Sequence, residues 1–328
     1  DLAAGGGPRA PGLFAELGRR AVAARGADVL LGSTGAGTGA TVAELKGFTQ
    51  AWSGRGGDLS LPHLHVPTSS LNSSIDGARR FVAQSWPFAR IHAVGKAFGG
   101  TFNDAVLAMC AGGLRQYLHN HAELPDESLK CMVPVSLRQA GDVDSGNAVA
   151  AISADLATNV SDPSKRIQAI IASVQAGKAF FKGMSPKEIE LVSMVMQTPT
   201  ILLMPTGLIS RLPPYNVAIS NVPGIRETMY WNGARMVGSY PLSIVTDGMA
   251  MNITLVTYEQ NVDFGIIACR RSAPQVQRLI DYMDDALAEL EDAVGITATR
   301  KAPRKRKAAR KRAAPAKKRA KQKTKAKA

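Results

Sequence analysis

The sequence has few cysteines and no recognisable export signal. Only three cysteines occur in 328 residues, far apart and each within an apolar stretch. An odd, scattered set of this kind argues against a disulfide framework or a cysteine-ligated zinc site, and it is typical of reduced, buried thiols in a cytoplasm. The chain opens with an acid and glycine-rich residues, a composition that does not resemble a secretory signal peptide.

Long apolar runs are equally scarce. Residues 191–210 form the longest uncharged run, and its 20 residues match the length that crosses a bilayer. The run contains Pro199, Pro205 and Gly207, however, and proline interrupts helices. We therefore expect a pair of short helices here, either buried or lying on a membrane surface, rather than a transmembrane span.

Acidic residues are absent from the C-terminal segment 300–328, which holds 16 of the 40 lysines and arginines. The rest of the chain carries the other 24 bases against 26 acids, so the net charge of +14 belongs to this tail. A segment without apolar periodicity cannot bury enough surface to fold, and we expect it to be disordered. Its charge suits either an anionic lipid surface or the phosphates of a nucleic acid, but it has no aromatic residue for base stacking.

The N-terminal segment 1–60 predicts one weak helix followed by a connector. Its glycine-rich part, 32–39, lacks the Lys-Ser/Thr ending of a phosphate-binding loop and the spacing of a dinucleotide-binding motif. We interpret this part as a linker.

The stretch 241–270 is expected to be the structural centre. It contains three apolar, strand-like runs, the second of which alternates with period two and ends at a turn formed by Glu259 and Gln260. This pattern predicts a β-hairpin. The last run begins at Asp263 and stays apolar to Cys269, so we expect both of its faces to be buried in a large sheet.

Amphipathic helices and further strands surround this hairpin in the sequence. The helix that begins near Asn103 has a good N-cap in that residue, and Asp104 suits the positive end of the helix dipole. The combination predicts an α/β architecture with helices packed on a mostly antiparallel or mixed sheet. Strands are expected at 81–83, 129–135, 147–156 and 215–222, and helices at 88–98, 103–118, 163–181 and 275–294.

No catalytic centre is evident from the residues alone. His119 and His121 follow a helix end, but no third metal ligand accompanies them, and His63, His65 and His92 have no partner pattern. No serine stands in a Gly-x-Ser-x-Gly turn.

Several short motifs nevertheless recur in an informative order. They are Arg79-Arg80-Phe81, GGTFNDAVL at 99–107, PVSLR at 134–138, Gly146-Asn147, SNVPG at 220–224 and Asp263-Phe264-Gly265. Together they resemble the bacterial wax ester synthase/diacylglycerol acyltransferase family, over about residues 62–294. The site and channel positions that the resemblance implies are Asn103, Asp104, Pro134, Ser136, Leu137, Arg138, Gly146, Asn147, Ser220, Asn221, Pro223, Gly224, Asp263, Phe264 and Gly265.

The resemblance implies an α/β, chloramphenicol-acetyltransferase-like fold of CoA-dependent acyltransferases, a mixed sheet flanked by helices. We expect mainly its C-terminal half, as a domain at 61–299 between the connector 1–60 and the tail 300–328. The implied reaction moves a fatty acyl group from acyl-CoA to diacylglycerol or a long-chain alcohol, giving triacylglycerol or wax esters. Acyl-CoA is then a co-substrate, and neither a cofactor nor a metal is implied.

In that family the catalytic base is the second histidine of an HHxxxDG motif, which these 328 residues do not contain. We therefore expect a C-terminal fragment, inactive alone, whose base lies upstream. Asn103 and Asp104 are then auxiliary: Asn103 either donates to the reacting carbonyl or only caps its helix. Asp263 is expected to hold its strand and the channel floor.

Two alternatives stay open: a catalytically silent lipid-binding or scaffold homologue, and nucleic-acid binding through the tail. Because the implied substrates are lipids, we favour attachment of the tail, with 191–210 as a second contact, to an anionic membrane or lipid-droplet surface. The expected location is cytoplasmic, peripheral to the inner membrane or lipid droplets.

Overall fold

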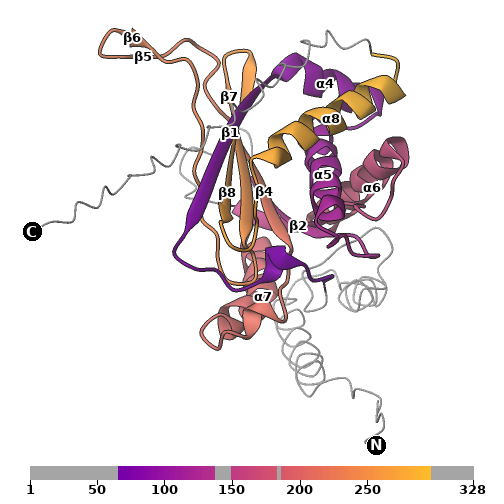
Figure 1. Ribbon diagram of the computed structural model, residues 1–328, viewed down its shortest axis with the longest axis vertical. Coiled ribbons are helices and arrows are strands. Elements are labelled where there is room, and N and C mark those ends of the chain that lie inside the picture. The colour runs from indigo at the N-terminus through magenta and orange to yellow at the C-terminus, as the bar shows by residue number, and fades with distance from the viewer. Residues whose placement is uncertain (1–65, 137–148, 183–185, 297–328) are drawn as a thin grey trace, which may run out of the picture.

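A computed structural model describes residues 66–136, 149–182 and 186–296 of the chain (Figure 1). The expectations for the connector 1–60, the glycine-rich part 32–39 and the tail 300–328 lie outside these residues. A short 3-10 helix, η2 (Ser70–Asn72), comes first in the described part, and the rest is a sheet, a helical layer and two projecting segments.

A six-stranded mixed sheet forms the centre, in the order β1-β8-β7-β4-β2-β3. Strand β4 is parallel to both of its neighbours, β2 and β7, and the other neighbouring pairs are antiparallel. The predicted mixed sheet is therefore confirmed. The strands are β1 (Arg79–Pro87), β2 (Lys130–Ser136), β3 (Val149–Asp155), β4 (Val217–Val222), β7 (Met251–Tyr258) and β8 (Asn261–Cys269).

The predicted hairpin is β7–β8, which lies inside the sheet. Its turn is Glu259-Gln260, with Glu259 at a positive φ of 49°. Every residue of β8 after Asn261 is buried, as the apolar run predicted. The prediction of a third strand at 241–245 is wrong: Pro241 has no N–H for a ladder, and Leu242 and Ile244 are exposed.

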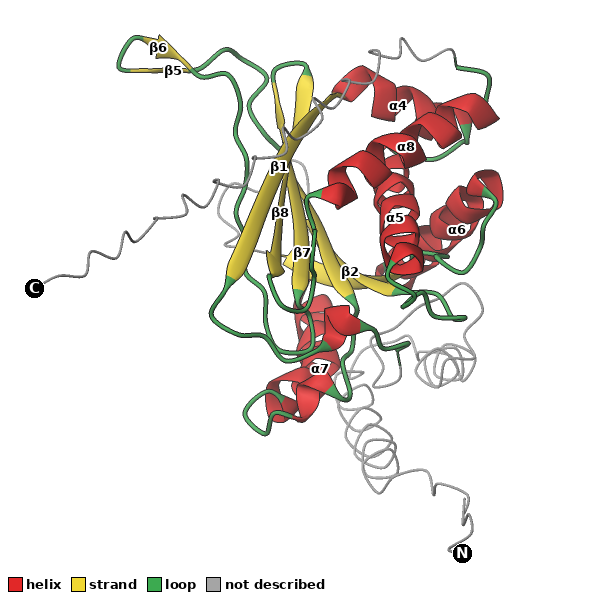
Figure 2. Cartoon of the chain, in the orientation of Figure 1, coloured by secondary structure: helices red, strands yellow, loops and turns green. Residues whose placement is uncertain are grey.

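Four helices cover one face of the sheet (Figures 1 and 2). Small residues let the central pair, α5 and α8, approach closely. A Cβ at Gly112 would lie 2.6 Å from the Cβ of Ala286, and one at Gly113 would lie 2.6 Å from Cγ of Met283. The helices confirm the predicted ones, although α8 begins three residues late: α4 (Phe88–Ala97), α5 (Phe102–Asn120), α6 (Pro163–Phe181) and α8 (Arg278–Ala293).

A buried ion pair fixes α4 against α8. The guanidinium of Arg90 donates to both carboxylate oxygens of Glu291, at 2.8 and 2.7 Å, and only 1% of the Glu291 side chain is exposed. These hydrogen bonds raise the pKa of Arg90. Asp284, about two turns before Glu291 on α8, accepts from Nε1 of Trp86 at 3.0 Å, so β1 is tied to the same helix.

A second ion pair lies at the far edge of the sheet. Nζ of Lys130 on β2 is 2.5 Å from Oδ2 of Asp155 on β3. Burial alone would raise the pKa of Asp155, but Lys130 and the hydroxyl of Ser128 outweigh it and hold that pKa below its ordinary value.

The uncharged run 191–210 differs from the expected pair of short helices. It belongs mostly to one 18-residue helix, α7 (Pro186–Leu203), which continues through Pro199 and is followed by the 3-10 turn η3 (Leu208–Ser210). Proline removes one hydrogen bond, and here the loss falls only four residues before the helix ends. None of the helices in the described ranges is long and apolar enough to cross a membrane.

The end of α7 and the turn after it carry an exposed apolar surface, which we call the α7 patch. Its large hydrophobic residues are Ile201, Leu202, Met204, Leu208 and Leu212, with Ile201 and Leu202 64% and 67% exposed.

A second projecting segment, residues 225–244, is called the arm. It carries the two-stranded ribbon β5 (Tyr230–Trp231) and β6 (Ala234–Arg235), which stands away from the main sheet in Figure 1. Asn232 and Gly233 make its turn with φ of 53° and 81°. Trp231 at the tip is 84% exposed. The base of the ribbon is tied to the β7–β8 hairpin, because Arg235 forms an ion pair with Glu259 at 2.9 Å and the buried Tyr258 hydroxyl bonds the backbone on either side of the ribbon at 3.0 Å.

Candidate functional site

Two of the sequence motifs meet at one end of the sheet. Asn103 lies in the first turn of α5, and Asn221 lies near the end of β4. Nδ2 of Asn221 donates to Oδ1 of Asn103 at 2.6 Å, although the two residues are 118 positions apart. The motif residues that follow, Pro223 and Gly224, leave the sheet at the same end, so this end is the candidate site.

Asn103 was predicted to be the N-cap of α5, and this prediction is wrong, because Thr101 caps the helix. Thr101 has extended backbone angles, and its hydroxyl accepts from the N–H of Asp104. Oδ2 of Asp104 in turn accepts from the backbone N and the hydroxyl of Thr101, at 2.7 and 2.8 Å. This reciprocal capping box occupies Asp104, whose side chain is buried, and it leaves Asn103 free of any capping duty.

The side chain of Asn103 is therefore oriented from outside its own helix. Because Asn221 donates to its carbonyl oxygen, the Asn103 amide nitrogen is left to donate elsewhere. Asn103 is exposed, and no hydrogen bond from its Nδ2 is formed within the described ranges. Asn221 is less exposed, and its own Oδ1 is buried without a partner. The pair presents one directed N–H donor at the positive end of a 19-residue helix.

An aromatic cluster with a cation lies beside this pair. Phe102, next to Asn103, stacks on Phe88 at a ring distance of 4.7 Å, and His92 stacks on Phe88 at 5.5 Å. The guanidinium of Arg226 lies 4.4 Å from the Phe88 centroid. Phe88 and His92 are four residues apart in α4, but Phe102 and Arg226 come from other elements, so no sequence spacing predicted the whole cluster.

The histidines of α5 are far from the Asn103–Asn221 pair. His119 and His121 are at the opposite end of the helix, and 19 residues extend about 28 Å. Nδ1 of His121 is also engaged with the carbonyl of Tyr117 at 2.7 Å. Within the described ranges, no group of three or more His, Cys, Asp or Glu side chains is placed to hold a metal.

Gly224 brings the chain back against the hairpin as it leaves β4. A Cβ at this position would lie 1.8 Å from the carbonyl oxygen of Thr257 on β7. Only glycine permits this approach, and the contact fixes where the arm begins.

The Asp263-Phe264-Gly265 motif fixes where the arm ends. Asp263, 1% exposed, accepts from the hydroxyl of Ser85 at 2.5 Å and from the N–H of Ser239 at 2.7 Å. A Cβ at Gly265 would lie 1.8 Å from the carbonyl oxygen of Pro241. These contacts hold the returning arm on the face of the sheet opposite the helices.

Phe264, between these two residues, points the other way. Its ring packs edge-on against Trp86 at 5.0 Å, inside the core under α8. Ser85, Ser239 and Tyr240, whose hydroxyl lies 2.9 Å from that of Ser85, were not singled out from the sequence. They are more than 20 positions from Asp263, and no spacing rule connects them.

The remaining motif positions are only partly visible. Pro134 and Ser136 lie in β2, paired with Ala151 and Val149 of β3. Leu137, Arg138, Gly146 and Asn147 lie outside the described residues. The structure therefore brings Asn103 together with the SNVPG motif and keeps the Asp263 motif on the opposite face.

The three cysteines are buried and free, as their apolar surroundings predicted. Burial raises the pKa of Cys110 and Cys131 well above the ordinary thiol value, so neither is a ready nucleophile.

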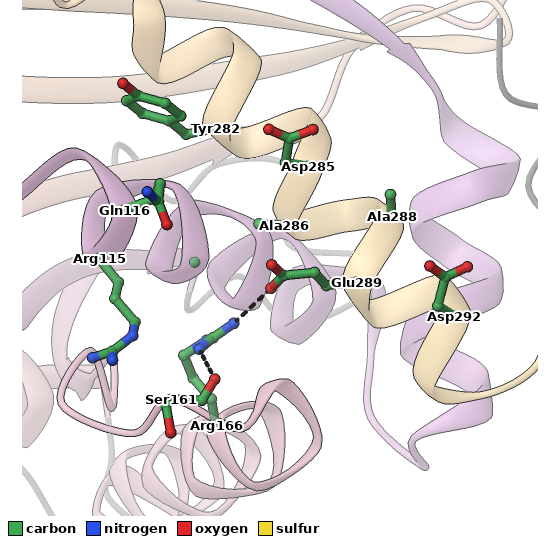
Figure 3. Close-up of a pocket in the computed structure, with 11 residues that line it drawn as sticks. Arg115, Gln116, Ser161, Arg166, Tyr282, Asp285, Ala286, Ala288, Glu289 and Asp292 are labelled. Atoms are coloured by element: carbon green, nitrogen blue, oxygen red, sulfur yellow. Dashed lines mark hydrogen bonds and ion pairs between the residues drawn. The ribbon is translucent and has the colours of Figure 1, made fainter. Parts of the chain in front are cut away.

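A pocket of about 550 Å³ lies elsewhere, among α5, α6 and α8 (Figure 3). Its α5 residues begin at Gly112, nine positions and about 14 Å along the helix from Asn103. It contains none of the site and channel positions that the resemblance implies, and it is a separate feature.

Comparison with known proteins gives two family matches. Residues 145–291 match the WS/DGAT C-terminal domain, and residues 8–106 match the wax ester synthase/diacylglycerol acyltransferase catalytic domain. A putative diacylglycerol O-acyltransferase of Mycobacterium tuberculosis H37Rv is 48% identical over 239 residues, which is 73% of this chain and 53% of that protein. The O-acyltransferase WSD of Acinetobacter baylyi is 41% identical over 229 residues, 70% of this chain and 50% of that protein.

Among solved structures, the wax ester synthase/diacylglycerol acyltransferase of Marinobacter aquaeolei VT8 is similar, with a TM-score of 0.63 and 38% identity. The match covers 80% of this chain and 59% of that one. The chain thus spans about half the length of the curated relatives it matches.

Proposed function

Because this chain belongs to the wax ester synthase/diacylglycerol acyltransferase family, we propose that it is the C-terminal part of an acyl-CoA-dependent O-acyltransferase. Its mixed sheet and helical layer are those of the CoA-dependent acyltransferase fold. The proposed acceptors are diacylglycerol and long-chain alcohols, and the products are triacylglycerol and wax esters. The observation that carries the proposal is the 48% identity to a protein named as a diacylglycerol O-acyltransferase, over 73% of this chain.

The proposed reaction is a direct transfer. A histidine takes the proton of the acceptor hydroxyl, the hydroxyl oxygen attacks the thioester carbonyl, and the tetrahedral oxyanion collapses. The C–S bond breaks, and the leaving CoA thiolate takes the proton from the imidazolium. The HHxxxDG motif that supplies this histidine is not among the 328 residues. General-base help is worth about 10²–10⁴-fold, so we propose that this chain is nearly inactive until joined to a segment bearing the motif.

Asn103 is proposed to stabilise the oxyanion. Asn221 holds its carbonyl oxygen at 2.6 Å, which directs its amide N–H outward beside the positive end of α5. A preorganised donor of this kind contributes on the order of 10²–10³-fold to the rate when it faces the developing charge. Asp104 supports the arrangement only indirectly, by closing the capping box under it.

The other motif residues are proposed to be structural. Asp263 and Gly265 hold the end of the arm on the sheet, and Gly224 holds its beginning. The arm then forms a wall of a substrate channel whose remaining parts come from other segments of the family fold.

We also propose a peripheral lipid contact. The α7 patch exposes five large apolar side chains within 12 residues, and Arg211 is the one charged residue among them. Such a surface lies readily in a membrane interface. The tail adds attraction to anionic lipid of about 1 kcal/mol for each base near the surface. In flotation with anionic vesicles, Ile201→Ser/Leu202→Ser should reduce binding, whereas Ile225→Ser, on the arm, should not.

The enzymatic proposal is tested by reconstitution. The N-terminal half of the Acinetobacter relative, which is 41% identical to this chain where the two align, is fused to this chain. Release of free CoA from palmitoyl-CoA is then measured with hexadecanol or dioleoylglycerol as acceptor. The same N-terminal half fused to its own C-terminal half is the positive control, and this chain alone is the blank.

Acceptor-dependent CoA release with formation of the ester is the expected result. A folded fusion that consumes no acyl-CoA, while the positive control turns over, contradicts the enzyme and supports the silent homologue. In that case a fluorescent fatty acyl probe that still binds the chain identifies it as a lipid-binding protein.

A further inference from the structure

The acidic residues of α8 gather where a helix least tolerates them. Glu289, Glu291 and Asp292 lie in or beside its last turn, which contains no base. The C-terminal end of a helix carries a partial negative charge, so carboxylates there are destabilising unless a cation is near. Arg90 neutralises Glu291, but Asp292 is exposed and makes no ion pair within the described ranges. The helix end thus has unmatched negative charge.

The pocket in Figure 3 lies along the same helix. Asp285, Glu289 and Asp292 line it from α8, and Arg115 and Arg166 line it from α5 and α6. Its three carboxylates are exposed, whereas Arg166 is 2% exposed and lies deep in the wall. The pocket therefore has a negative rim and a positive floor, and its remaining lining is neutral.

The guanidinium group of Arg166 has only some of its hydrogen-bond donors paired. Its Nη1 donates to the carbonyl oxygens of Val160 and Ser161, at 2.9 and 3.1 Å, and its nearest carboxylate, Glu289, is 3.7 Å away. Its Nε is buried without an acceptor. Burial lowers the pKa of Arg166, which agrees with incomplete compensation of its charge. A ligand for this pocket should offer cations to the rim and neutral acceptor oxygens to the floor.

We propose that this pocket and the acidic face of α8 bind the basic segment 300–328 of the same chain. A lysine- and arginine-rich peptide has both required groups: cationic side chains for Asp285 and Asp292, and backbone carbonyl oxygens for the arginine side. The segment carries 16 bases and no acid. Arg115 and Arg166 carry the same charge as the basic segment and repel its side chains. We therefore expect the lysine and arginine side chains of the segment to contact the acidic rim, while its backbone faces the floor of the pocket.

The connection is short enough for this. The described chain ends at Ile296, whose N–H bonds back to the carbonyl of Glu291 at 2.9 Å, and Gly295 has a φ of 71°. This is the reversal that commonly ends a helix, and it leaves the chain four residues beyond Asp292. Asp285 and Asp292 are about 10 Å apart along α8, whereas residues 297–328 reach about 100 Å when extended.

Tethering favours this occupant over a separate anionic partner in dilute solution. A short linker raises the effective concentration of the segment to about the millimolar range. Anionic lipid and nucleic acid become competitors that release it. The inference uses only charge, reach and the pocket, and it does not rest on the proposed acyltransferase activity.

The test uses the full chain and zero-length carbodiimide crosslinking, which joins a lysine to a carboxylate in direct contact. Peptide mapping should find lysines of 300–328 attached to Asp285, Glu289 or Asp292. In parallel, tryptic cleavage within 300–328 is followed at low and high salt. Docking held by two exposed ion pairs should slow cleavage about fivefold at low ionic strength, and this protection should vanish near 1 M salt, where the Debye length is about 3 Å.

A matched pair of variants isolates the site. Asp285→Lys/Asp292→Lys should abolish both the protection and the crosslinks to Glu289. Asp126→Lys/Glu127→Lys changes the net charge equally, at exposed acids of another loop, and should leave both intact. If the first variant unfolds at a lower temperature than wild type, Asp285→Asn/Asp292→Asn replaces it, with the same expectation.

Three outcomes overturn the proposal. Equal loss in both charge-reversed variants means a general attraction to the protein surface. Full tryptic accessibility at low salt, or crosslinks only to other carboxylates, means that the segment is not docked. Protection that grows with protein concentration means that it binds a second copy instead.

Discussion

Arg90→Ala should reveal how strongly the α4–α8 ion pair contributes to stability. The variant removes both hydrogen bonds to Glu291 and leaves a carboxylate that is 1% exposed. Removing one partner of a buried pair typically costs 3–5 kcal/mol, because the remaining charge is uncompensated.

The partial exposure of Arg90 sets the expected magnitude. Its side chain is 30% exposed, so water can reach part of the space that alanine leaves and solvate the Glu291 carboxylate. The expected loss at pH 7 is therefore near the lower end of that range, about 3 kcal/mol.

Urea unfolding followed by circular dichroism at pH 7 measures the difference. The double variant Arg90→Met/Glu291→Leu is the control, because replacing a whole buried pair by apolar residues is often nearly neutral. It should recover most of the stability that Arg90→Ala loses. A loss below about 1 kcal/mol in Arg90→Ala, or a double variant as unstable as the single one, would refute the reasoning.

Three further predictions concern other contacts. Gly265→Ala places a Cβ 1.8 Å from a backbone carbonyl and should destabilise the fold by about 3 kcal/mol, whereas Gly77→Ala, with open space around it, should be nearly neutral in the same thermal unfolding experiment. Lys130→Met should lower stability by about 0.5–1 kcal/mol at pH 7; because the pKa of Asp155 in the fold is held below its ordinary value of 3.8, this difference should shrink as the pH falls below 3.8 and disappear once the pH has passed the lowered pKa, and a difference that does not shrink there would be inconsistent with the pair. Asn103→Ala should lower the turnover of the reconstituted enzyme about 10²–10³-fold while changing the unfolding midpoint little; the reverse result would make this residue a structural one.

Local patterns in the sequence predicted most of the elements. The apolar stripe of α8 follows from burial of one helix face, and that signal needs no tertiary information. Strand β7 was recognised from its alternation, although the structure buries almost all of its residues on both faces. The N-cap of α5 was misassigned because Asn103 and Thr101 are both good caps. The choice depends on which one adopts extended backbone angles, and here the backbone N–H and hydroxyl of Thr101 both donate to Oδ2 of Asp104.

The errors at proline have a different origin. Pro199 was expected to divide the run 191–210, but one missing hydrogen bond near a helix end is tolerated when the preceding turns are in place. The run at 241–245 has the composition of a strand, yet its chain crosses the sheet face where Gly265 leaves room for a carbonyl. In this run apolar composition indicates neither burial nor hydrogen-bond partners, because Leu242 and Ile244 are exposed.

The candidate site lay largely beyond sequence reasoning. Family resemblance placed Asn103 and Asn221 in separate motifs, but their hydrogen bond spans 118 positions. The contact depends on the order of strands in the sheet, which no local pattern encodes. The same holds for Arg226 over Phe88, where the cation follows a turn and the ring begins a helix.

The arm has a mechanical property that follows from its two glycine contacts. Gly224 and Gly265 clamp its ends against backbone carbonyl groups, and both clamps involve the β7–β8 hairpin or its neighbouring residues. A domain inserted at the tip, between Asn232 and Gly233, should therefore disturb the ribbon at most and leave the strand register of the main sheet unchanged. The tip is thus a natural insertion point for a reporter domain or an affinity handle.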